Sequence, residues 1–103
     1  MRFLMKVSFP VEAGNEAAKN GFKAIQTILE QQKPEAAYFQ AENGMRTALL
    51  IVNMQDASEI PGLAEPWFLA LNAHIEMKPV MLPADLQKAG PAIAEAVKAH
   101  GNR

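Results

Sequence analysis

The sequence predicts an α+β fold with one four-stranded antiparallel sheet, on three observations. The chain has 103 residues, of which 50% are hydrophobic, enough for one modest core. Alternating and helical patterns of apolar residues follow one another as strand, helix, strand, strand, helix, strand, with a further helical segment at the end. Asn43-Gly44, a dipeptide typical of tight hairpins, separates the two middle strands. We therefore expect residues 1–103 to form a single domain.

The first strand and the first helix are expected at residues 2–9 and 14–33. Apolar side chains occupy every second position of the strand, as a half-buried strand requires. In the helix, apolar residues recur at spacings of three and four and form one stripe. Asn20-Gly21 is a weak point in this helix, and Pro34 ends it.

The hairpin that follows is expected to pair residues 35–42 with residues 45–54. A type I′ turn needs positive φ at both central residues, which suits Asn43-Gly44. The second strand of the hairpin is apolar on both faces, with Leu49 and Ile51 on one of them. Such a strand is normally covered on both sides.

The second half of the chain is expected to form a helix, a strand and a broken helix. In the helix at 57–71, Pro66 should cause a kink or a division into two short helices, because proline removes a backbone hydrogen bond. Residues 73–81 alternate as an edge strand would. Residues 83–100 are helical with a break at Gly90-Pro91.

The order βαββαβ is that of a ferredoxin-like fold, with strand order 4-1-3-2 and both helices on one face of the sheet. The other face would then carry Leu4, Leu49 and Ile51 at its centre. An apolar patch of this kind is unfavourable in water. The sequence therefore predicts a homodimer that buries these three residues, sheet against sheet.

The segment Glu65-Pro66-Trp67-Phe68 and the later strand Ile75-Glu76-Met77-Lys78-Pro79-Val80 resemble the dimeric α+β barrel superfamily. The resemblance extends over residues 2–82 and is nearest to small bacterial members of unassigned function. It implies that two ferredoxin-like sheets close into a barrel, and that a small hydrophobic ligand could lie between helix and sheet. The superfamily also contains isomerases, cofactor-free monooxygenases, haem proteins and stress-induced proteins, and fold alone does not choose among them.

Composition excludes several classes of function. The chain has no cysteine, so disulfides, thiol catalysis and cysteine-ligated metals are excluded. With 10 basic and 11 acidic residues it lacks the basic character of a nucleic-acid-binding protein. It shows neither a signal peptide nor a membrane-spanning run, so we expect a cytoplasmic protein without membrane or nucleic-acid partners.

His74 and Glu76 are the candidate catalytic residues, because they lie two apart on one face of the last strand. His74 could act as a general base oriented by Glu76. In the simpler interpretation, which we favour, Glu76 pairs with Lys6 on the first strand. A metal site would need a third ligand that the sequence does not offer, and we expect no cofactor.

The candidate ligand pocket is lined by Tyr38, Arg46, Trp67 and Phe68. The two adjacent aromatics would form its wall, and Arg46 could pair with an anionic ligand; in the simpler interpretation, Trp67 and Phe68 complete the apolar stripe of a core helix. Three functions remain open: binding of a small hydrophobic or anionic molecule, cofactor-independent catalysis with His74, and a non-catalytic structural or stress-associated homodimer.

Overall fold

A computed structural model describes residues 1–102. The four strands are β1 (Arg2–Ser8), β2 (Ala36–Glu42), β3 (Met45–Asn53) and β4 (His74–Pro79). The helices are α1 (Val11–Lys19), α2 (Lys23–Gln32), α3 (Ile60–Leu71), α4 (Pro83–Lys88) and α5 (Gly90–His100), with a short 3-10 helix at Ala57–Glu59 before α3. The predicted α+β class is confirmed.

The strands form one antiparallel sheet in the order β2-β3-β1-β4. This is the arrangement 4-1-3-2 counted from the opposite edge, and it is compatible with a ferredoxin-like fold. The register places Met5 of β1 beside Leu50 of β3 and Met77 of β4. The hairpin turn has positive φ at Asn43 (53°) and Gly44 (75°), as predicted.

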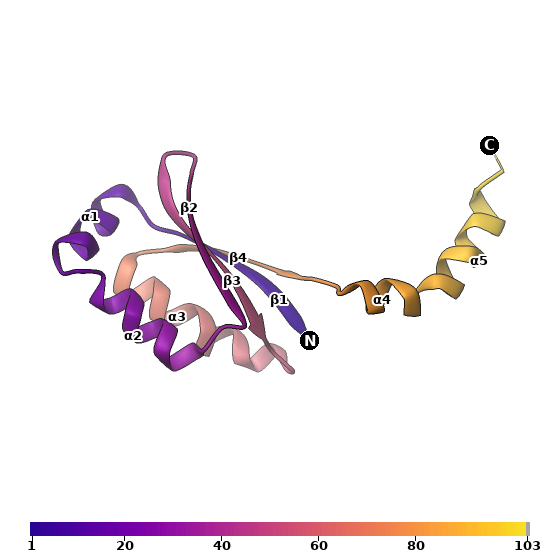
Figure 1. Cartoon of the computed structure of the whole chain (residues 1–103), viewed down its shortest axis with the longest axis horizontal. Coiled ribbons are helices and arrows are strands. Elements are labelled where there is room, and N and C mark those ends of the chain that lie inside the picture. The colour runs from indigo at the N-terminus through magenta and orange to yellow at the C-terminus, as the bar shows by residue number, and fades with distance from the viewer. Residues whose placement is uncertain (103) are drawn as a thin grey trace.

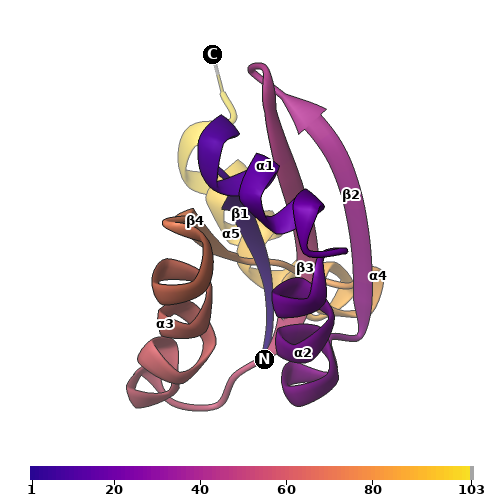
Figure 2. The same ribbon diagram turned by 90° about the vertical axis from the view of Figure 1, so that its left-hand side faces the viewer.

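The core lies between one face of the sheet and helices α1, α2 and α3 (Figure 2). Met5, Val7 and Leu50 are fully buried on that face. Trp67 of α3 is also fully buried, and its ring stacks on Phe9 with centroids 5.9 Å apart. Within residues 1–102, no helix packs on the other face of the sheet, which we call the open face.

The expected single helix at 14–33 is wrong. The structure has two helices, which begin earlier, at Val11, and are interrupted between Lys19 and Lys23. Gly21 (φ 68°) and Phe22 (φ 58°) both adopt left-handed backbone, which no α-helix accommodates. The weak point predicted at Asn20-Gly21 is therefore a complete break.

The division into two short helices expected at Pro66 does not occur, because α3 continues through this residue; the alternative of a kink there stays a prediction. Proline deprives the carbonyl of Gly62, four residues earlier, of its helical donor. Gly62 is exposed, so water can replace the missing hydrogen bond. The helix is nevertheless preceded by an irregular turn, in which the Glu59 carboxylate accepts a hydrogen bond from the Asp56 backbone amide at 2.8 Å.

The last 22 described residues, 81–102, leave the rest of the molecule as an extended arm (Figure 1). We call this segment the C-terminal arm, and residues 1–80 the body. The arm gives the chain extents of 58 × 28 × 20 Å. A break occurs close to the predicted one at Gly90-Pro91 but one residue earlier, at Ala89: α4 ends at Lys88 and α5 begins at Gly90, so Gly90 opens the second helix rather than ending the first. Among residues 1–102, no helix is long and apolar enough to cross a membrane.

Candidate functional site

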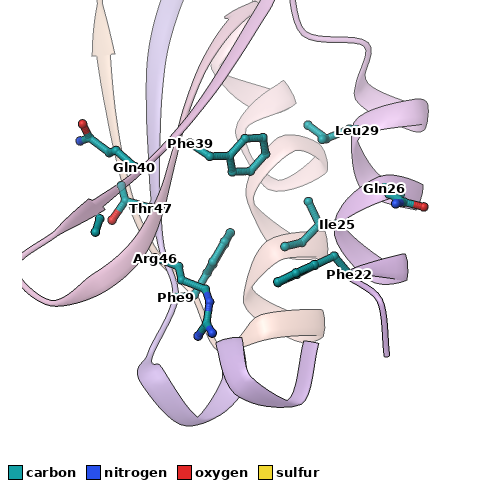
Figure 3. A pocket seen from close by; sticks show the side chains of 10 residues that line it. Phe9, Phe22, Ile25, Gln26, Leu29, Phe39, Gln40, Arg46 and Thr47 are labelled. Atoms are coloured by element: carbon teal, nitrogen blue, oxygen red, sulfur yellow. The ribbon is translucent and has the colours of Figure 1, made fainter. Parts of the chain in front are cut away.

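A cavity of about 580 Å³ opens between α2 and the β2–β3 hairpin, on the helix-covered side of the sheet (Figure 3). Its volume lies within the range of small-molecule sites. Most of the wall is apolar and consists of Phe9, Phe22, Ile25, Leu29, Phe39 and Ala41. The polar residues at the wall are Gln26, Gln40, Arg46 and Thr47.

The cavity exists because α2 does not reach over the edge strand β2. Phe39 of β2 pairs with Ala48 of β3, whose small side chain fills little of the space beside it. Phe39 therefore projects toward α2 with 55% of its surface exposed, and Phe22 faces the same space from the start of α2 (Figure 3). Both phenylalanine rings are partly exposed to water at the same cavity, and binding of an apolar molecule there would bury their exposed surface.

Arg46 is the positively charged residue at the cavity wall. The Nη1 atom of Arg46 donates a hydrogen bond to the Oδ1 atom of Asn15 at 3.1 Å. The guanidinium lies against Gly14, where an added Cβ would be only 2.8 Å from Nη1. Within residues 1–102, no carboxylate forms an ion pair with Arg46. Its remaining donors can therefore bind a carboxylate or a phosphate.

The four residues predicted for a ligand pocket are not brought together. Arg46 lines the cavity. Trp67 lies in the core, as the simpler interpretation had it, and donates a hydrogen bond to Gln32 at 3.2 Å. Phe68 is 41% exposed on α3, away from the cavity wall. Tyr38 is 66% exposed and pairs with Leu49, so strand alternation places it on the open face.

His74 and Glu76 also lie on the open face, opposite the cavity side of the sheet. His74 is exposed beside Ser8 of β1, and within the described residues no hydrogen bond joins it to Glu76. Glu76 instead lies 3.4 Å from Lys6, which confirms the predicted cross-strand pair. Lys6 also donates a hydrogen bond to Glu42 at 2.5 Å. This hydrogen bond, with a lesser one to Glu76, raises the pKa of Lys6 above its usual 10.5 against the opposing effect of desolvation.

The three residues expected at a dimer interface share the open face. Leu4 pairs directly with Ile51, and Leu49 pairs with Lys6 on the neighbouring strand. All three are partly buried by their neighbours within the sheet. Tyr38 extends the same apolar patch onto β2.

Sequence reasoning missed the phenylalanines of the cavity. Phe39 alternates with Ala37 and Ala41 along β2, and this pattern of one large residue between two small ones could have indicated a gap. The helical spacing of apolar residues in 14–33 places Phe22 on the buried stripe of one continuous helix, whereas the helix break turns it toward the cavity. Among the described residues, no group of three or more histidine or acidic residues could hold a metal ion.

Comparison with known proteins assigns no family to the chain. No protein-family model matches the sequence, and no curated protein is significantly similar to it.

Proposed function

We propose that the protein binds a small, mainly apolar molecule that carries an anionic group, in the cavity between α2 and the β2–β3 hairpin. The observation that carries the proposal is an apolar wall with a single cation that has no carboxylate partner among residues 1–102. Phe22 and Phe39 would enclose the apolar part of the ligand, and Arg46 would pair with its charge.

The lining supports binding rather than acid–base catalysis. Of the described residues, those at the cavity wall include no histidine, carboxylate or lysine. Thr47, the only hydroxyl there, donates a hydrogen bond to the Met45 carbonyl at 3.2 Å. The alternative of an enzyme that uses His74 would require a second site on the open face, since His74 does not line this cavity.

The proposal includes a homodimer in which two open faces meet, as in a dimeric α+β barrel. Its support is the uncovered apolar patch of Leu4, Leu49 and Ile51. Charge does not oppose this contact, because the Arg2–Glu35 pair and the cluster of Lys6 with two glutamates leave the face close to neutral. Sedimentation velocity of the wild-type chain measures the association directly.

Binding in the cavity can be tested with 8-anilinonaphthalene-1-sulfonate, a fluorescent apolar anion. We expect Ala41→Trp, which fills the cavity from β2, to weaken binding at least about 10-fold, because the ring occupies the ligand's space. Arg46→Met should weaken it about 5- to 20-fold through loss of one charge-assisted contact. Lys19→Met on α1 is the control for charge and should leave the affinity unchanged.

Equal affinity in the wild-type protein, Ala41→Trp and Arg46→Met would place the dye elsewhere and overturn the proposal. Circular dichroism of each variant shows whether the fold is retained. Ala41 is exposed on an edge strand, where an aromatic residue is well accommodated, so Ala41→Trp is expected to fold.

A further inference from the structure

The C-terminal arm carries an apolar stripe that stays exposed in the part of the chain that the structure describes, residues 1–102. Leu82, Leu86, Ala89, Ile93 and Val97 follow one another at spacings of three and four, the pattern of a helix face meant for burial. Between 42% and 61% of each of the four large side chains is exposed. An exposed apolar helix face of this kind is typical of a surface that packs against another protein surface.

The arm also leaves the body in a direction that leads away from the core (Figure 1). The Val80 amide donates a hydrogen bond to the Arg2 carbonyl at 3.1 Å, which prolongs the pairing of β4 with β1. The chain therefore continues straight past the end of the sheet. Helices α1–α3 lie on one side of the sheet and the arm lies on the other, the side of the open face (Figures 1 and 2).

The helices of the arm are too short to be stable by themselves. α4 has 6 residues and α5 has 11, whereas isolated helices shorter than about 12–15 residues are marginal in water. A single i,i+3 ion pair, Lys98–Glu95 at 3.9 Å, adds little to α5. The helical arm thus needs a surface to pack against.

The open face needs additional contact area in turn. Four strands about 4.8 Å apart and about seven residues long, at about 3.3 Å per residue, present roughly 400 Å² in projection. A stable protein–protein interface buries about 800 Å² on each partner. Two open faces in contact are therefore small for a stable dimer, and an arm on the same side of each sheet would enlarge the interface.

We propose that the C-terminal arm is an exchanged dimerisation element: in a pair of chains, each arm packs its apolar stripe against the body of the second copy. Two-fold symmetry makes both contacts equivalent, so one stripe on the chain supplies two contacts in the dimer. The arm's own length is sufficient, since its helical residues at about 1.5 Å each extend about 25 Å, more than the width of a four-stranded sheet. This inference rests on the homodimer proposed above.

The test compares two matched substitutions in the full-length chain. Val97→Asp puts a charge on the apolar stripe, and Ala99→Asp puts the same charge on the far side of α5. By sedimentation velocity, we expect Val97→Asp to raise the dimer dissociation constant at least 10-fold and Ala99→Asp to change it less than 2-fold. Equal effects of the two substitutions would overturn the proposal.

Amide hydrogen exchange of residues 90–100 provides an independent measurement. We expect α5 to exchange at least 10-fold more slowly in the dimer than in a monomer produced by Ile51→Lys on the open face. Equal protection in dimer and monomer would mean that the arm folds onto its own body, and rapid exchange in the dimer would mean that it packs against nothing. Either result overturns arm exchange but leaves the sheet-to-sheet dimer standing. A wild-type chain that stays monomeric at about 100 μM overturns both.

Discussion

Replacing Trp67 with alanine tests how far α3 holds the core together. The indole is fully buried, stacks on Phe9 and donates a hydrogen bond to the Gln32 side chain at 3.2 Å. Gln32 in turn donates to the Leu63 carbonyl at 2.9 Å, so Trp67 links α2 to α3. Removing a buried tryptophan costs about 3–5 kcal/mol, and the lost hydrogen bond about 1 kcal/mol within that range. We expect the free energy of unfolding to fall by about 4 kcal/mol.

Urea unfolding followed by circular dichroism measures this loss, since the variant has no tryptophan fluorescence. Trp67→Phe retains an aromatic ring and should lose only about 2 kcal/mol, which keeps the test valid if the alanine variant does not fold. Leu69→Ala is the control on the same helix, because Leu69 is 83% exposed and its loss should cost less than about 0.5 kcal/mol. A loss below about 1 kcal/mol for Trp67→Ala would refute the placement of this residue in the core.

Two further predictions concern the open face. Ile51→Lys should raise the dimer dissociation constant more than about 100-fold in sedimentation velocity, because an unpaired charge would be buried at the interface; an unaltered dimer would exclude this face as the contact. His74→Gln should leave affinity for the anionic dye unchanged and alter the free energy of unfolding by less than about 0.5 kcal/mol, since His74 is exposed and lies across the sheet from the cavity. A loss of dye binding in this variant would mean that His74 contributes to the ligand-binding site, contrary to its placement on the open face.

The features that the sequence predicted correctly depend on local patterns. Alternation along β1 placed Met5 and Val7 in the core, and both are fully buried. The turn at Asn43-Gly44 set the hairpin register through backbone preferences of two residues. Lys6 and Glu76 meet because the strand order makes their strands neighbours. The first two inferences needed no knowledge of packing between distant elements, whereas the Lys6–Glu76 pair also needed the strand order that the order of elements predicts.

The features that the sequence did not predict depend on competition between local preference and packing. An apolar stripe at helical spacing ran through Gly21 and Phe22, but two residues of left-handed backbone interrupt it. Pro66 has a strong local tendency to break a helix, yet burial of Trp67 and Leu71 beyond it favours a continuous one. The direction of the C-terminal arm follows from where β4 ends, which no pattern within residues 83–100 encodes.

The cavity and the helix break have a common physical origin. If residues 14–33 formed one straight helix, Phe22 would belong to its buried stripe and contribute to the core. The break at Gly21 instead sets α2 apart from α1 and leaves Phe22 facing Phe39 across open space. Arg46 is held at this space by Asn15 and by the missing side chain of Gly14, both on α1. The two helices thus contribute differently to the cavity. Helix α1 positions the guanidinium of Arg46, and α2 provides the apolar wall against which a ligand would lie.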